Sequence, residues 1–124
     1  MKSKIIATFG PSCSDLRVLK NVIGAGASIV RVNLKYVSVR DYEKVRERIC
    51  RAGKVKVMVD IKDRSVLEEM IGKQFDYLAV SFAESSSEIV KIRKMFPGRV
   101  KVISKIETKK GVDNIDDLIR VSDG

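Results

Sequence analysis

The sequence predicts an α/β protein made of about five consecutive βα units around a parallel sheet. Short apolar runs alternate along the chain with segments of helical period, as such units require. Every predicted strand also ends in polar side chains. Two architectures fit this pattern, a doubly wound open sheet and part of an eight-stranded βα barrel, and both place their chemistry at the carboxyl ends of the strands.

The units follow one another without a linker or a low-complexity segment. Strands are predicted at residues 4–10, 27–33, 55–61, 75–82 and 99–108. Helical segments are predicted at residues 14–26, 38–53, 65–73, 86–96 and 112–121. Ser14 or Asp15 suits the N-cap of the first helix, and Gly24 or Gly26 suits its end.

Length and composition fit one globular domain, residues 1–124. No apolar run approaches the roughly 20 residues of a membrane span, and the N-terminal segment does not resemble a signal peptide, so we expect a cytoplasmic protein without a membrane partner. Cys13 and Cys50 are the only cysteines and histidine is absent. This excludes a Cys/His zinc site and an imidazole base, which leaves lysine, carboxylates and hydroxyls for catalysis.

The net charge of +9 suits several kinds of anionic partner, including nucleic acid and phosphorylated metabolites. Most of the basic residues fall on predicted helix surfaces, which favours solvated faces over a nucleic-acid footprint. Three Tyr and four Phe without any Trp offer little for base stacking. Nucleic-acid binding is therefore the least favoured function.

Two motifs place charged side chains on a common strand face. In RVKVISKIET, Lys105 and Glu107 share a face, either as a surface ion pair on an edge strand or as the rim of an active site. In RVNLK, Arg31, Asn33 and Lys35 share a face and suit phosphate or carboxylate oxygens. The alternative for this second motif is pairing with acidic residues on neighbouring loops.

Asp60, in the motif VDIKD, also has two interpretations. It is either a cation ligand or the partner of Arg31 across adjacent strands, and the spacing favours the pair. We expect Arg31, Asp60, Lys105 and Glu107 to lie within their strands rather than past the strand ends. With Ser81 on the fourth strand, they would meet at one rim of a barrel.

These segments resemble the pyruvate kinase family. KIIATFGPSCSDLRVLKNVIGAGASIVRVN is similar to the opening of its barrel domain, and ISKIETKKGVDNIDDLIRVSDG is similar to its lysine-bearing strand and the following helix. VDIKD and FDYLAVSF fall between them in the expected order. The resemblance implies a partial TIM-like (βα)8 barrel that transfers a phosphoryl group between phosphoenolpyruvate and ADP, giving pyruvate and ATP.

The resemblance also implies roles for the residues that bind substrate. Arg31 would contact the transferring phosphoryl group, with Asn33 and Ser81 beside it. Lys105 would stabilise the charge that develops on the phosphoryl group and the enolate oxygen. Lys105 and Arg31 are therefore the expected catalytic residues.

The family implies two cations as cofactors, Mg²⁺ and usually K⁺. Glu107 would hold the magnesium ion, while Asn33 and Asp60 would bind the monovalent cation. Where the family has Asn-Phe-Ser-His-Gly, however, this chain has a lysine, Lys35, in place of the hydroxyl ligand of potassium. We expect the Lys35 ammonium group to occupy the cation position, so that potassium is not required.

Two further departures from the family concern whole segments. Residues 60–64 lead straight into a helix where the family inserts a β-domain, so no lid domain is expected between about residues 62 and 66. Residues 121–124 precede the strand that supplies the second magnesium ligand of the family. We expect a truncated piece or a short lidless relative that is inactive by itself; the alternative is a non-catalytic anion-binding, metal-binding or assembly module.

About five strands cannot close an eight-stranded barrel, so an exposed sheet edge should pair with a second copy or a partner chain. Light scattering should therefore detect a homo-oligomer or a complex rather than a monomer. A monodisperse monomer would count against an incomplete barrel and favour an open doubly wound sheet.

Overall fold

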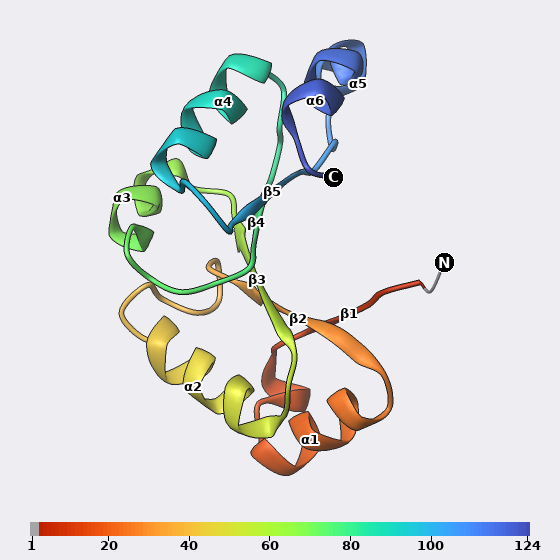
Figure 1. Cartoon of the computed structure of the whole chain (residues 1–124), viewed down its shortest axis with the longest axis vertical. Coiled ribbons are helices and arrows are strands. Elements are labelled where there is room, and N and C mark those ends of the chain that lie inside the picture. The colour runs from red at the N-terminus through yellow and green to blue at the C-terminus, as the bar shows by residue number, and fades with distance from the viewer. Residues whose placement is uncertain (1–2) are drawn as a thin grey trace.

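The computed structural model describes residues 3–124, which form one sheet of five parallel strands (Figure 1). The strands are β1 (Ile5–Thr8), β2 (Ala27–Asn33), β3 (Lys56–Ile61), β4 (Tyr77–Val80) and β5 (Lys101–Ser104). Their order in the sheet is their order in the sequence. A doubly wound sheet reverses its strand order near the centre, so the sequential order confirms the alternative prediction, part of a βα barrel.

Helices connect the strands and cover one side of the curved sheet (Figure 1). They are α1 (Leu16–Gly24), α2 (Tyr42–Ala52), α3 (Leu67–Met70), α4 (Ser86–Met95), α5 (Lys109–Asp113) and α6 (Ile115–Val121), with short 3₁₀ helices η1 (Pro11–Cys13) and η2 (Arg64–Val66). Strand β3 passes through a short turn into η2. None of the helices in the described range is long and apolar enough to cross a membrane.

Local sequence signals explain several of these boundaries. The side chain of Asp15 accepts hydrogen bonds from the backbone N–H groups of Arg17 and Val18 at 2.9 and 3.3 Å, which confirms it as the N-cap of α1. Gly26 has a φ of +119°, a conformation that L side chains rarely adopt. Strand β2 has the predicted bounds, residues 27–33.

The fifth strand is shorter than predicted. It ends at Ser104, so the expectation that Lys105 and Glu107 lie within the strand is wrong. The N–H of Lys105 still bonds to the Val80 carbonyl at 3.0 Å, but the Lys105 carbonyl accepts from Ala83, in the loop after β4. The chain leaves the ladder at this point, and both charged residues belong to the loop that follows β5.

The main core lies between the sheet and the helices. It consists of alternate strand residues and the apolar faces of the helices, among them Val30, Val32, Val59, Ile61, Leu78, Val80, Leu19, Ile49, Ile89 and Leu118. Tyr42 is also fully buried there, and its hydroxyl donates a hydrogen bond to the Gln74 carbonyl at 2.7 Å. Burial raises the pKa of the Tyr42 hydroxyl above its ordinary value.

The opposite, inner face of the sheet carries a smaller apolar cluster. Ile29, Met58 and Ala79 are buried there, with Tyr77 and Ile103 packed against them. At the β1 edge, Ile5 and Ile6 are 56% and 47% exposed. The inner face is therefore apolar along its middle and open at the β1 end.

The β5 edge of the sheet is partly covered by the last residues of the chain. The N–H of Asp123 donates to the Val102 carbonyl at 2.8 Å, and Ser104 donates to the Gly124 carbonyl at 2.9 Å. The Asp123 side chain accepts from the Val102 N–H at 2.8 Å and from the Arg93 guanidinium at 2.6 Å. This edge is thus less exposed than the sequence predicts.

The contacts of the Asp123 carboxylate with Val102 and Arg93 predict that part of the stability of the fold is lost in acid. The Val102 N–H and the nearby Arg93 lower the pKa of Asp123 below its ordinary value. A carboxyl group whose pKa is lower in the folded state stabilises the fold above its unfolded pKa, and this stabilisation is lost as the pH falls through the folded pKa. Asp123→Asn should therefore unfold at lower urea concentration at pH 6 and lose less stability between pH 6 and pH 3.

The control for this experiment is Asp117→Asn, because Asp117 is 62% exposed and pairs only with Arg120 on its own helix. This variant should follow the unmodified chain at both pH values. Equal losses on acidification in the unmodified chain and in Asp123→Asn would contradict the account.

Candidate functional site

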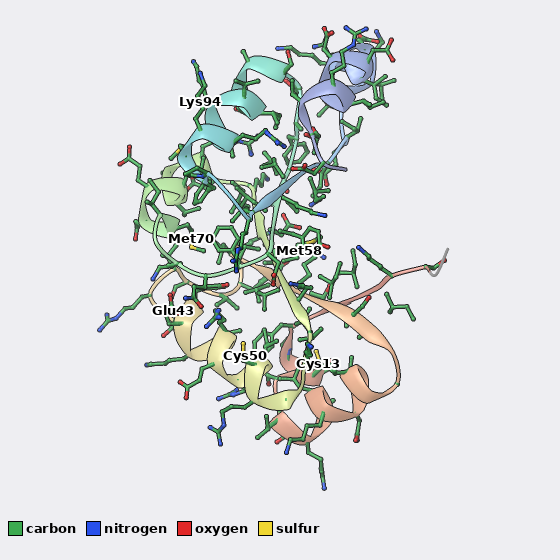
Figure 2. All side chains as sticks on the ribbon, viewed as in Figure 1. Cys13, Glu43, Cys50, Met58, Met70 and Lys94 are labelled. Carbon is green, nitrogen blue, oxygen red and sulfur yellow. The ribbon has the colours of Figure 1, made fainter. Side chains whose placement is uncertain are left out.

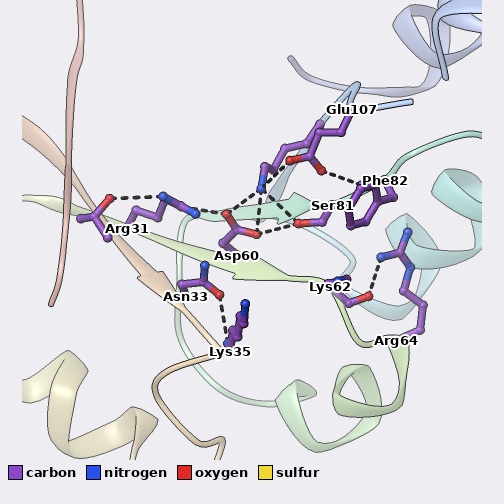
Figure 3. Close-up of polar contacts among 11 residues, drawn as sticks. Arg31, Asn33, Lys35, Asp60, Lys62, Arg64, Ser81, Phe82 and Glu107 are labelled. Carbon is purple, nitrogen blue, oxygen red and sulfur yellow. Dashed lines mark hydrogen bonds and ion pairs between the residues drawn. The ribbon is translucent and has the colours of Figure 1, made fainter. Parts of the chain in front are cut away.

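Five polar side chains, each from the carboxyl end of a strand or from the residue just after it, form a cluster beside the inner face; Ser81 and Lys105 directly follow β4 and β5, so the expectation that Ser81 lies on the fourth strand is wrong. We call Thr8, Arg31, Asp60, Ser81 and Lys105 the Asp60 cluster (Figure 3). Four of these residues line a cavity of about 400 Å³, whose floor is formed by apolar side chains of the inner face. The structure brings together the predicted residues Arg31, Asp60, Ser81 and Lys105, with Glu107 beside Lys105, and adds Thr8; their roles in a site stay predictions.

Asp60 lies at the centre of the cluster and is only 1% exposed. Its Oδ2 atom accepts from Arg31 Nε at 2.7 Å and from Lys105 Nζ at 3.1 Å. Its Oδ1 atom accepts from the Ser81 hydroxyl at 3.2 Å. A buried carboxylate is stable only with such compensation, so the partners explain how Asp60 tolerates its position. The predicted pair of Arg31 and Asp60 across adjacent strands is present.

Lys105 joins the cluster from the loop after β5. Its ammonium group donates to the Ser81 hydroxyl at 3.0 Å and lies 3.4 Å from a Glu107 oxygen. Its side chain remains 29% exposed. Lys105 therefore contacts both a buried anion and a half-buried one, which is more than a surface ion pair.

Arg31 reaches the cluster through two of its guanidinium nitrogens. Besides the bond to Asp60, its Nη1 atom donates to the Thr8 hydroxyl at 3.3 Å. Among the described residues, Nη2 has no protein hydrogen-bond partner, and the side chain is 29% exposed. This leaves N–H donors facing the cavity, where they can bind an anionic oxygen.

Glu107 is held by the backbone of Phe82, a residue that the sequence did not indicate. The Phe82 N–H donates to Glu107 Oε2 at 2.9 Å, and Phe82 has a φ of +51°. A bulky residue in this left-handed region is strained, and such residues often occur at functional sites. The Lys62 ammonium group lies 5.2 Å from the centre of the Phe82 ring, a cation–π contact between the loop after β3 and the loop after β4.

Asn33 and Lys35 lie apart from these contacts (Figure 3). Strand β2 ends at Asn33, whose side-chain oxygen accepts from the Lys35 backbone N–H at 2.9 Å and so closes a turn. The expectation that Lys35 shares a strand face with Arg31 is therefore wrong. The Lys35 ammonium group lies 5.4 Å from the centre of the Tyr36 ring instead.

The carboxylates expected to bind magnesium and the monovalent cation differ in how free their oxygen atoms are. Within residues 3–124 no group of three or more Asp, Glu, Cys or His side chains is placed to hold a metal ion. Glu107 keeps a half-buried carboxylate within reach of the cavity, and magnesium commonly takes one or two carboxylates plus oxygens of the substrate. Both oxygens of Asp60 already accept from cationic or hydroxyl donors, and its role as a ligand of the monovalent cation stays a prediction.

Removing the charge of Asp60 should destabilise the fold. Asp60→Asn leaves Arg31 and Lys105 facing a neutral amide, but both keep some access to water, so we expect a loss of about 2 kcal/mol rather than the larger cost of a fully buried charge. Urea unfolding measures this difference. Asp113→Asn, which removes an exposed helix pair, should change stability by less than about 0.5 kcal/mol. Equal effects of the two substitutions would contradict the role of Asp60.

Comparisons with known proteins identify pyruvate kinases as relatives of this chain. The chain aligns with a pyruvate kinase of Thermoplasma acidophilum at 21% identity over 221 positions, covering all of this chain and 41% of the relative. A pyruvate kinase of Clostridium perfringens is 37% identical over 67 residues, covering 51% of this chain and 14% of the relative. One from Staphylococcus aureus is 29% identical over 109 residues, covering 86% of this chain and 15% of the relative.

The chain thus spans less than half the length of these relatives. The first alignment is longer than the chain itself, which means that the relative has segments without a counterpart here. The model of one protein family, described as the pyruvate kinase barrel domain, matches residues 54–124, which is more than half of the chain. With five parallel strands in sequential order and their helices, the chain belongs to the pyruvate kinase barrel-domain family.

Proposed function

We propose that the Asp60 cluster binds phosphoenolpyruvate and takes part in pyruvate-kinase-type phosphoryl transfer to ADP. The observation that carries the proposal is the buried Asp60 carboxylate, which holds Arg31 and Lys105 on the same side of one cavity. Two fixed cations beside a cavity suit a ligand that carries a phosphoryl group and a carboxylate.

Each cation has a distinct role in this proposal. Arg31 binds a phosphoryl oxygen through the N–H groups that Asp60 and Thr8 leave free. Lys105 stabilises the negative charge on the enolate oxygen as the phosphoryl group departs. Ser81 is a positioning residue, because its hydroxyl contacts both Lys105 and Asp60.

Glu107 is the residue that would hold magnesium, since its carboxylate lies beside Lys105 and is fixed by the Phe82 N–H. The bound ion supplies positive charge that offsets the charge of the phosphate groups. Asn33, predicted to bind phosphate and the monovalent cation, lies at the end of β2 outside the cavity lining, where its side-chain oxygen accepts from the Lys35 N–H; a role in binding would require that turn to open. A cytoplasmic location fits these ligands and the two free cysteines.

The open site argues for slow or absent turnover by this chain. Strand β3 passes directly into η2, where Asp63 caps the helix by accepting from the Ser65 N–H at 2.9 Å. We propose that residues 1–124 form one domain without a lid, which leaves the cavity open to water and lowers the rate of transfer.

A second candidate function is a non-catalytic module that binds a phosphorylated acid. The observation that favours it is the single available carboxylate, Glu107, because Asp60 is already occupied by Arg31 and Lys105. Binding of the ligand would survive in such a module, while transfer of the phosphoryl group would not.

Measurements of binding and of catalysis separate the two functions. Titration calorimetry should detect phosphoenolpyruvate binding, and Lys105→Met should weaken it about tenfold, as expected for the loss of one charge-assisted contact. Lys109→Met, at a residue whose side chain is 92% exposed, should bind as well as the unmodified chain. A coupled assay for pyruvate in the presence of magnesium then reports transfer.

Pyruvate formation that Lys105→Met abolishes supports the enzyme. Binding without any pyruvate formation supports the module. Equal phosphoenolpyruvate binding by the unmodified chain and Lys105→Met would contradict both, because both place the ligand against Lys105.

We also propose that the site works without potassium. The notable feature is that Arg31 and Lys105 already neutralise Asp60, while Lys35 replaces a hydroxyl ligand of the family. Replacing potassium chloride by tetramethylammonium chloride at equal ionic strength should leave phosphoenolpyruvate binding and any activity unchanged. A strong requirement for potassium would refute this proposal.

A further inference from the structure

A second depression lies at the opposite ends of the same strands. It has a volume of about 570 Å³ and is formed by α2, by the start of β3 and by the segments that lead into β4 and β5. We call it the amino-end depression and define it by Arg46, Cys50, Lys73, Asp76 and Arg99. Its volume lies in the range of small-molecule sites.

Three cationic side chains from three different segments line this depression. Arg46, on α2, donates through one nitrogen to the Gln74 side chain at 2.7 Å and keeps its other N–H groups. Lys73 is 23% exposed and lies 3.6 Å from Glu43. Arg99 has no hydrogen bond or ion pair with any residue that the structure describes.

The one acid that lines the depression is already engaged. Asp76 accepts from the Lys56 ammonium group at 3.0 Å through one oxygen and from the Val57 N–H at 2.8 Å through the other. The positive charges of Arg46, Lys73 and Arg99 therefore outweigh the negative charge inside the depression. This imbalance favours an anionic ligand.

Apolar side chains complete the lining between the cations. Phe75, Pro97 and Val100 present carbon surface in the same depression. A site that combines convergent cations with an apolar wall suits an anion that carries an organic part. A simple inorganic anion would contact only the cationic side chains and not the apolar wall.

We infer that the amino-end depression binds a small phosphorylated organic molecule. It is distinct from the Asp60 cluster, because the two lie at opposite ends of β3 and share no lining residue; along the strand, Val57 of the depression and Asp60 of the cluster are three residues, or roughly 10 Å, apart. Arg46, Lys73 and Arg99 hold the phosphate oxygens, and Phe75 contacts the organic part. The inference does not depend on the proposed function, since no residue of the Asp60 cluster lines this depression.

Cys50 provides a local reporter of binding. It lies one helical turn after Arg46 on the same side of α2, lines the depression and is an exposed free thiol. A ligand in the depression should slow its alkylation by iodoacetamide. Mass spectrometry of the digested chain distinguishes Cys50 from Cys13, the other free cysteine.

The test uses inorganic pyrophosphate and adenosine monophosphate as probes at about 0.15 M salt, where weak long-range attraction is screened. Both probes should slow Cys50 alkylation. Arg46→Gln and Arg99→Gln should each weaken binding about tenfold, as expected for a lost charge-assisted contact. Arg99→Gln guards against an effect on folding, because Arg99 has no described partner to lose.

Arg51→Gln is the matched control, since it removes one charge from α2 outside the depression. It should leave binding unchanged, and Lys105→Met should leave the protection of Cys50 unchanged. The inference is overturned if Arg51→Gln weakens binding as much as Arg46→Gln. It is also overturned if the probes fail to protect Cys50.

Discussion

The site depends on the burial of one carboxylate, that of Asp60. This group is almost inaccessible to water, so its ionised form requires compensation from within the protein. Arg31 supplies it from the neighbouring strand β2 and Lys105 from the loop after β5, and Ser81 adds a hydroxyl donor. The same contacts that stabilise Asp60 fix the two cations beside the cavity, so stability and the placement of these cations depend on one set of interactions.

The two carboxylates that contact Lys105 differ in their surroundings. A carboxylate held by two cationic side chains has little capacity for a further monovalent ion. Glu107 is different, because it contacts Lys105 at 3.4 Å, keeps part of its surface exposed and is anchored by a backbone N–H. The structure therefore separates a buried carboxylate that is fully paired from a more accessible one.

The sequence predicts the fold well where local chemistry decides it. The alternation in residues 27–33 identifies β2, and the side chain of Asp15 identifies the start of α1. The pair of Arg31 and Asp60 follows from adjacent parallel strands. Strand order was not decided by periodicity, because both parallel architectures use the same βα units.

Contacts between distant segments account for what the sequence did not predict. Strand β5 ends early because Lys105 bonds to Ala83, and Lys35 leaves the strand because Asn33 closes a turn. The left-handed backbone of Phe82 has no local signal, since phenylalanine does not favour it. The amino-end depression likewise needs three segments that meet only in the folded chain.

A double-mutant cycle between Asp60 and Lys105 tests the central claim most directly. The free energy of unfolding is measured for the unmodified chain, Asp60→Asn, Lys105→Met and the double variant. If Asp60 holds Lys105 in place, the two substitutions should be non-additive, with a coupling energy of about 1–3 kcal/mol. Additivity to within about 0.5 kcal/mol would show that the two residues act independently and would contradict the account.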